Sequence, residues 1–244
     1  MFGRKFLIFI FFSTFLFGQK NVENQQLLWY GYYNKLQINQ NWVLNSEVQE
    51  RHFYQPLVQH QLVFRTNLDR RILDDINVSL GFVVFLQSPN DPESESTLMV
   101  PELRIDFGFN AKKKYKYFNV NQRFKVEARF FHQTENNELV GGYQFSNFRM
   151  RYQLGLDIPL IKKQDAEKLI LKIKDEVMFN FGKNIVKNVF DQNRIYIGLN
   201  YPMNKNLAFE AGYLNWFQQR PSGTDFYNRD IIRFSVFHTI NLKK

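Results

Sequence analysis

Few residues in this chain could carry out chemistry. Cysteine is absent, so the chain offers no disulfide, no thiolate nucleophile and no thiolate metal ligand. Histidine, the commonest general base, occurs four times, at His52, His60, His132 and His238. The chain has no G-x-S-x-G nucleophile motif beside any of them. We therefore expect no enzymatic activity and no catalytic residues. The alternative is a lipid-modifying membrane enzyme that uses one of the histidines.

Other polar clusters do not predict a ligand site. Asp91, Glu93 and Glu95 alternate in PNDPESES, and carboxylates suit hard cations, but the spacing lacks the glycine and terminal glutamate of a calcium loop. We expect a solvated acidic loop, no metal site and no cofactor. The basic run KKKYK at 112–116 fits either an anionic lipid surface or a plain turn. Gly141 and Gly142 mark a turn without a phosphate-loop context.

The charge of the chain does not indicate nucleic-acid binding. The formal net charge is +9, yet lysines and arginines alternate with acidic residues and form no basic stripe. Aromatic residues make up 17% of the chain, with 27 phenylalanines, while the mean hydropathy is only −0.40. Such a composition predicts elements that separate apolar from polar side chains.

The N-terminus resembles an export signal. Arg4 and Lys5 precede a mostly apolar run at 6–17, and Gly18 supplies a small residue for cleavage. This run is shorter than the ~20 residues of a membrane-spanning helix. We predict a signal peptide at 1–18 and one mature domain at 19–244, exported from the cytoplasm.

The stretch FNVNQRFKVEARFF at 118–131 shows the pattern of the mature chain. One register is almost entirely apolar and the other is charged. This period of two predicts a strand with two unlike faces. Similar strands are expected at 26–37, 42–52, 58–69, 76–87, 101–110, 118–131, 144–157, 168–181, 193–201, 206–217 and 230–242.

These strands predict an all-β protein, a transmembrane antiparallel up-and-down β-barrel of about 10–12 strands. No amphipathic helix is available to cover an open sheet, and closure removes the edges. Single-chain bacterial barrels usually have an even number of strands. We therefore expect either that 26–37 lies outside the wall or that two strands have been merged.

Alternation alone does not distinguish a soluble barrel from a membrane barrel. Three features favour the membrane: strands of at least nine residues, connections that are short at one end and mostly longer at the other, and aromatic residues near strand ends, as in interfacial girdles. The connection at 158–168 is an exception to this rhythm, and 88–97, 132–142, 182–192 and 218–228 are the longer ones. The aromatic residues concerned are Trp29, Tyr30, Trp42, Phe53, Tyr54, Tyr115, Tyr117, Tyr201, Trp216 and Tyr227.

The registers assign the two faces. The predicted lipid-facing residues of the example strand are Phe118, Val120, Phe124, Val126, Ala128 and Phe130. The predicted lumen-lining residues are Arg65, Arg104, Arg123, Lys125, Glu127, Arg129, Arg149, Arg151, Lys172, Lys174, Glu176, Arg194, Glu210 and Arg233. Basic residues outnumber acids on the inner face, so a residual path should favour anions.

The segment WYGYYNKLQINQNWVLNSEVQERHF at 29–53 joins an aromatic-rich strand to a short turn before Trp42 and a strand that ends in Glu-x-x-x-Arg-His-Phe. It resembles the start of the outer-membrane barrel family called domain of unknown function 2490. The resemblance implies a bacterial outer-membrane location and brings no known reaction. The C-terminal Leu-Lys-Lys departs from the aromatic residue on which such barrels commonly finish.

The sequence therefore predicts a non-enzymatic, porin-like outer-membrane barrel with a mixed-charge, mostly filled lumen. Its role would be that of a narrow channel, a surface-binding protein or a structural element. Its partners would be outer-membrane lipid and, during insertion, the barrel-assembly machinery. A soluble exported barrel that binds an apolar ligand is a further alternative.

Overall fold

A computed structural model describes residues 21–163, 166–185 and 187–242. The predicted signal peptide at 1–18 lies outside these residues. The described part is all-β. It contains no helix that is long and apolar enough to cross a membrane. Eleven strands form the wall: β1 (Val22–Gln37), β2 (Trp42–Phe53), β3 (Gln59–Leu73), β4 (Ile76–Gln87), β5 (Val100–Lys114), β6 (Asn119–Glu135), β7 (Glu138–Lys163), β8 (Ala166–Phe181), β9 (Phe190–Pro202), β10 (Leu207–Gln219) and β11 (Phe226–Asn241).

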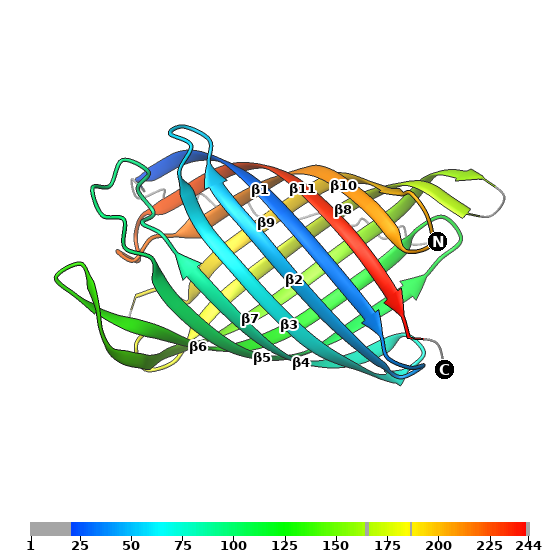
Figure 1. Ribbon diagram of the computed structural model, residues 1–244, viewed down its shortest axis with the longest axis horizontal. Helices are drawn as coiled ribbons and strands as arrows, with labels where there is room; N and C mark the ends of the chain where they lie inside the picture. The colour runs from blue at the N-terminus through cyan, green and yellow to red at the C-terminus, as the bar shows by residue number, and fades with distance from the viewer. Residues whose placement is uncertain (1–20, 164–165, 186, 243–244) are drawn as a thin grey trace, which may run out of the picture.

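The strands close into one barrel in which each strand pairs with its neighbours in sequence (Figure 1). Ten pairs are antiparallel, but β1 and β11 pair in parallel from Val22↔Phe226 to Gln37↔Asn241. An odd number of strands that alternate in direction leaves the first and last pointing the same way, so the closing pair must be parallel. The expectation that 26–37 lies outside the wall, or that two strands are merged, is wrong, and the barrel is mixed.

The two ends of the barrel differ. The loop end, on the left of Figure 1, carries the connections at 54–58, 88–99, 136–137 and 220–225, together with the described parts of 182–189. The turn end carries connections of two to four residues, at 38–41, 74–75, 115–118 and 203–206. The predicted connection at 158–168 is largely strand, because β7 and β8 continue through most of it.

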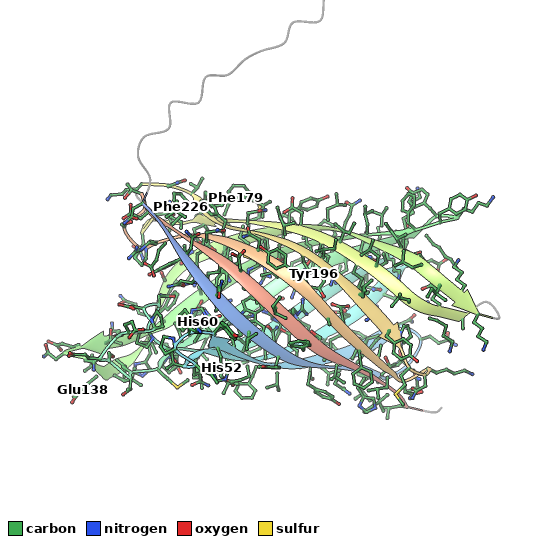
Figure 2. The ribbon with its side chains drawn as sticks, turned by 90° about the horizontal axis from the view of Figure 1, so that it is seen from above. His52, His60, Glu138, Phe179, Tyr196 and Phe226 are labelled. Carbon is green, nitrogen blue, oxygen red and sulfur yellow. The ribbon has the colours of Figure 1, made fainter. Side chains whose placement is uncertain are left out.

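The predicted loop at 132–142 is a hairpin extension of β6 and β7. Asn136 (φ 50°) and Asn137 (φ 62°) form its two-residue turn, and asparagine tolerates this left-handed conformation. The hairpin projects beyond the rest of the wall, with Glu138 near its tip (Figure 2). Gly141, at φ 61°, lies where the β6–β7 register shifts. Both faces of this hairpin are solvated, so it carries no apolar alternation that could predict it.

Along the wall, one face of each strand is apolar and points outward. Eight outward residues, one from each strand from β1 to β8, stand directly opposite one another across neighbouring strands. They form a continuous apolar row, which we call the outer row. Its most exposed members are Leu80 (59%) and Phe107 (58%). The outer row consists of Leu36, Leu44, Leu68, Leu80, Phe107, Val126, Met150 and Phe179.

The interior is not wholly polar. In its loop-end half, an apolar cluster of buried residues fills part of the space: Leu27, Trp29, Phe53, Tyr196, Leu214, Trp216 and Ile231. A smaller cluster contains Val63, Val83 and Phe85. Four of the ten aromatic residues predicted to form an outer girdle are therefore misassigned, because Trp29, Phe53, Trp216 and Tyr227 are 6% exposed or less. These side chains fall in the inward register.

Candidate functional site

The barrel interior brings the predicted charged residues together. All fourteen residues predicted to line a lumen lie in the inward register, where they are buried or half-buried. Of the six residues predicted to face lipid, five lie on the outer face of β6. Phe118 lies in the turn before β6 and stacks on Tyr115, with ring centres 5.0 Å apart.

Glu127 is the centre of the interior charge network. Its side chain has no exposed area. Arg149 donates to Glu127 Oε2 from Nε at 2.8 Å and from Nη2 at 2.5 Å. Arg151 donates to Oε1 from Nη1 at 2.6 Å. One buried carboxylate thus pairs with two arginines of the neighbouring strand, and both pairs combine charge with hydrogen bonds.

Similar pairs continue around the wall. Glu102 accepts hydrogen bonds from Arg104 and Arg129, and Glu176 accepts from Arg151 and Arg123. These networks cross-link β5, β6, β7 and β8 and fill much of the space between them. The remaining interior ion pairs among the described residues are Arg104–Glu127, Arg65–Glu47, Lys125–Asp106, Arg149–Asp191, Lys172–Asp157 and Lys174–Glu210.

Four inward arginines of the described chain form no ion pair with a carboxylate within 4.0 Å. They are Arg51, Arg194, Arg229 and Arg233. Each is held by neutral partners instead: Arg51 by Gln49 and Gln61, Arg194 by Gln192, Arg229 by glutamine and asparagine side chains, and Arg233 by the Tyr33 hydroxyl. The interior therefore carries positive charge that its own acids do not neutralise.

Three of these arginines surround the two buried indoles. Trp29 and Trp216 pack edge to face, with ring centres 5.6 Å apart. The guanidinium carbon of Arg51 lies 3.9 Å from the centre of Trp29. Those of Arg194 and Arg229 each lie 4.5 Å from the centre of Trp216. Cation–π contacts of this kind hold a guanidinium flat on the ring while its edge remains available for hydrogen bonds.

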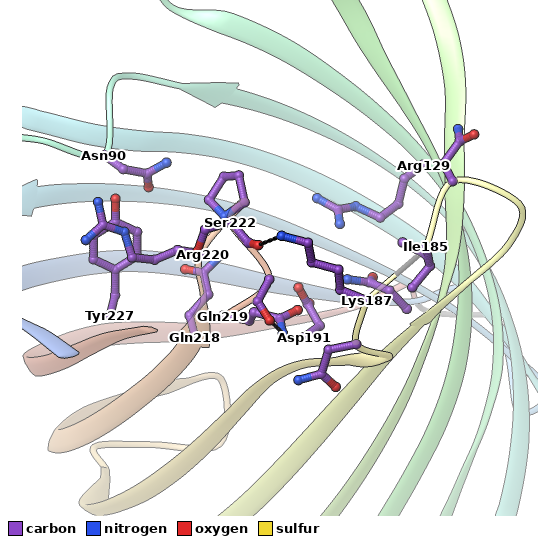
Figure 3. A pocket seen from close by; sticks show the side chains of 15 residues that line it. Asn90, Arg129, Ile185, Lys187, Asp191, Gln218, Gln219, Arg220, Ser222 and Tyr227 are labelled. Atoms are coloured by element: carbon purple, nitrogen blue, oxygen red, sulfur yellow. Dashed lines mark hydrogen bonds between the residues drawn. The ribbon is translucent and has the colours of Figure 1, made fainter. Parts of the chain in front are cut away.

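A cavity of about 500 Å³ opens at the loop end, and we call it the vestibule (Figure 3). Lys187 donates to the carbonyl oxygen of Ser222 at 3.0 Å across its rim. Its lining is mostly polar: Asn90, Arg129, Asn180, Asn184, Ile185, Lys187, Asn188, Asp191, Gln218, Gln219, Arg220, Pro221, Ser222, Gly223 and Tyr227.

Beneath the vestibule lies a smaller cavity of about 160 Å³, the arginine chamber, which shares Asn90, Arg129 and Gln218 with the vestibule. Seven arginines line the chamber, and Glu102 is the one acidic residue in its lining. Glu127 and Glu176 are not part of that lining. The arginines are Arg51, Arg65, Arg104, Arg129, Arg149, Arg151 and Arg194.

Two further cavities, each of about 260 Å³, continue toward the turn end. The first shares Arg51, Arg65, Arg151 and Arg194 with the arginine chamber. The second shares Tyr33, Glu47, Arg65 and Phe237 with the first. The four cavities follow one another along the barrel through shared lining residues, and the arginine chamber has the smallest volume of the four.

Asn90 ties the long loop at 88–99 into the barrel mouth. Its carbonyl oxygen accepts a hydrogen bond from Gln25 at 2.9 Å. Its side-chain Oδ1 accepts from Arg229 at 3.1 Å and lies 3.4 Å from His60 Nε2. These partners come from β1, β11 and β3, so one loop residue bridges three strands above the arginine chamber.

The four histidines have separate partners. His60 packs against Phe53 and Trp216 inside the barrel. His52 pairs with Glu50, His132 bonds to the carbonyl of Gln133, and His238 lies 2.8 Å from the Tyr32 hydroxyl. None of these contacts within the described chain joins a histidine to a serine or threonine. A search of the described residues also finds no group of three or more His, Asp or Glu that could hold a metal.

Sequence reasoning did not identify Arg229 as an interior residue. The last strand was predicted to begin at 230, whereas β11 begins at Phe226. Extending the inward register of Arg233 back by four residues would have found it. The pairing of Arg51 and Arg194 with the two indoles had no sequence signal, because the partners come from four different strands.

The sequence profile of a family described as "Protein of unknown function (DUF2490)" matches residues 26–228. This match covers most of the chain, so the chain belongs to that family. The match agrees with the resemblance of the segment at 29–53. No curated protein and no solved structure matches the chain.

Proposed function

We propose that this protein is a non-enzymatic outer-membrane β-barrel whose narrow interior passage favours small anions. The observation that carries the proposal is the reversal of the ordinary globular arrangement. Paired carboxylates and guanidiniums fill the interior, while large apolar side chains cover the outside. Soluble proteins rarely expose a continuous apolar surface of this extent, and lipid is the solvent that suits it.

Strand length supports the same proposal. Wall strands have 12 to 26 residues, and a tilted strand needs ~9–11 to cross a bilayer. Near the loop end, the outer face of β8 to β11 also carries a few hydrogen-bonded polar side chains, including Asp175 with Asn193 and Asn215 with Asn228. In the proposed orientation these groups lie at the level of polar headgroups.

Membrane fractionation tests the location. The protein is expected in the outer-membrane fraction, and it should migrate differently on a gel before and after boiling, because a folded barrel resists detergent. Recovery in the soluble periplasmic fraction would contradict the proposal. That result would favour the alternative of a soluble barrel, although the interior cavities are lined largely by charged and amide groups, which do not suit an apolar ligand.

The passage itself is expected to conduct weakly and to prefer anions. The arginine chamber is the smallest of the four cavities, and its lining is strongly basic. Barrels of about eight strands are filled by side chains, and open aqueous channels belong to barrels of 16–18 strands. Single-channel recording under a salt gradient should give a small conductance with a reversal potential of the sign that chloride selectivity requires. A large, cation-selective conductance would contradict this prediction.

Asn90→Ala is expected to increase that conductance. The change removes the Oδ1 acceptor from Arg229, at a cost of about 1.5–3 kcal/mol for a hydrogen bond to a charged group, and loosens the loop at 88–99 over the chamber. Recordings should show larger and noisier openings. Glu95→Gln, an exposed change on the same loop, serves as the control and should leave the currents unchanged. Equal currents for wild type and Asn90→Ala would show that this loop does not limit the passage.

A further inference from the structure

We propose that the arginine chamber is a binding site for a small oxyanion, a molecule that presents carboxylate or phosphate oxygens. This inference deepens the proposed function, because it names the class of solute that the passage would accept. It rests on the interior geometry alone, so it can be tested without a membrane.

The arginine chamber holds positive charge that no carboxylate partner in the described chain compensates. Arg51 and Arg194 line both the chamber and the cavity below it, and neither has a carboxylate partner within 4.0 Å in the described chain. Their guanidinium carbons both lie within 5.6 Å of the centre of Trp29, so two like charges share one indole. Buried charges are stabilised by pairing. A bound anion between these arginines would supply the missing counter-charge.

The arginine chamber also has hydrogen-bond donors that no residue of the described chain uses. A guanidinium group has five N–H donors in a fixed plane. Among the described residues, Arg194 makes one hydrogen bond, from Nε to Gln192 Oε1 at 3.1 Å. Its two terminal nitrogens are the groups that could bind a carboxylate or phosphate in bidentate fashion. Arg51 donates from all three of its nitrogens to Gln49 and Gln61, so it contributes mainly charge and a fixed position.

The guanidinium groups of the chamber are held in position before a ligand binds. The indoles of Trp29 and Trp216 hold the two guanidiniums against flat apolar surfaces. The ion pairs of Arg151 and Arg149 with Glu127 fix the opposite wall. Ligand groups therefore meet donors that are already in place, which lowers the entropic cost of binding.

The size of the site limits the ligand. The chamber holds about 160 Å³ and the cavity below it about 260 Å³. Drug-sized ligands usually occupy pockets of roughly 300–1,000 Å³. Inorganic phosphate, or a small acid with two or three carboxylates, fits this space, whereas a polymer does not.

Tryptophan fluorescence provides a direct test, because two of the three tryptophans in the chain lie beside the two arginines. The full-length protein in detergent micelles would be titrated with inorganic phosphate and, separately, with citrate, while sodium chloride holds the ionic strength constant. We expect a saturable change with at least one probe. A response to phosphate alone indicates a phosphate ligand, and a response to citrate alone indicates a polycarboxylate.

Arg194→Gln should weaken the apparent affinity at least tenfold, which corresponds to about 1.4 kcal/mol. Removing one of two like charges that lie against the same Trp29 ring should not prevent folding. Arg194→Lys, which keeps the charge but loses the planar donor pair, should give an intermediate affinity. Lys172→Gln is the matched control, because Lys172 is an interior cation that pairs with Asp157 and lines neither cavity. Its affinity should stay within twofold of wild type.

The absence of a saturable response to either probe would overturn the proposal, and so would an unchanged affinity in the folded Arg51→Gln/Arg194→Gln double variant. These outcomes are separate from those of the conductance and fractionation experiments. If the protein binds phosphate in micelles but does not conduct, the binding site is supported and the channel is contradicted. If the protein conducts but shows no saturable binding, the channel is supported and the binding site is contradicted.

Discussion

Val126→Arg is expected to prevent stable insertion of the barrel. Val126 lies on the outer face near the middle of β6, and its neighbours in the outer row are Phe107 and Met150. In the proposed membrane orientation the new guanidinium meets hydrocarbon, at a cost of about 2–4 kcal/mol near the midplane. That cost lowers the equilibrium constant for folding by roughly 30- to 1,000-fold. Urea titration of the protein refolded into vesicles, read by heat-modifiable migration, measures the change.

The matched control is Val126→Leu, which alters size without adding charge and should behave like wild type. The pair also separates the two kinds of barrel. In a soluble barrel, Val126 would face water, and an added surface arginine would change stability by no more than about 0.5 kcal/mol. Equal stability of the arginine and leucine variants would therefore contradict the lipid-facing assignment of this row.

Much of the wall could be predicted because alternation is a local signal. The stretch at 118–131 has a period of two through its whole length, and β6 spans Asn119–Glu135. Alternation marks the part of a strand whose two faces meet different surroundings. It fails in the hairpin around Asn136, where both faces are solvated and only backbone pairing maintains the strand.

Closure into a barrel was predicted from the need to remove sheet edges, but the parallel pair that closes the wall could not be predicted from local patterns. Strand parity depends on the total count, and nothing in 26–37 shows that its partner is the last strand in a parallel pair. The aromatic assignment failed for a related reason. Trp216 stands near the end of β10 and Trp29 near the start of the strand predicted at 26–37, as girdle residues do, but both side chains point inward. Position along a strand and side of the wall are separate variables, and only register determines the second.

Partners within the interior also depend on register. Lys125 stands directly opposite Gly108, which has no side chain, and its ammonium group reaches Asp106 on the same strand as that glycine, with a contact of 2.6 Å. A shift of one residue would send the lysine to the other face. Sequence alone thus placed the lysine inside the barrel, whereas the identity of its carboxylate partner required the pairing of β5 with β6.

Glu127→Gln is expected to destabilise the barrel by about 3–5 kcal/mol, the usual effect of removing one partner from a buried ion pair. The amide keeps the size of the side chain but removes the negative charge that pairs with Arg149 and Arg151. Both guanidiniums would remain buried at 5% exposure or less. Urea titration of the protein refolded into vesicles measures the loss, and Glu95→Gln, an exposed acid in the loop at 88–99, should change stability by no more than about 0.5 kcal/mol.

A double-mutant cycle with Arg151→Gln shows whether the loss comes from the network. Arg151 bridges Glu127 at 2.6 Å and Glu176 at 2.9 Å, so its removal also leaves Glu176 with Arg123 as its ion-pair partner. Residues in one hydrogen-bonded network couple by about 0.5–3 kcal/mol, and the double variant should be more stable than the sum of the single losses implies. Additivity of the two changes would mean that Glu127 stabilises the barrel without acting through Arg151. The charged interior would then be a set of independent pairs, and closure of β6 against β7 would depend on backbone pairing and on the packing of the two faces.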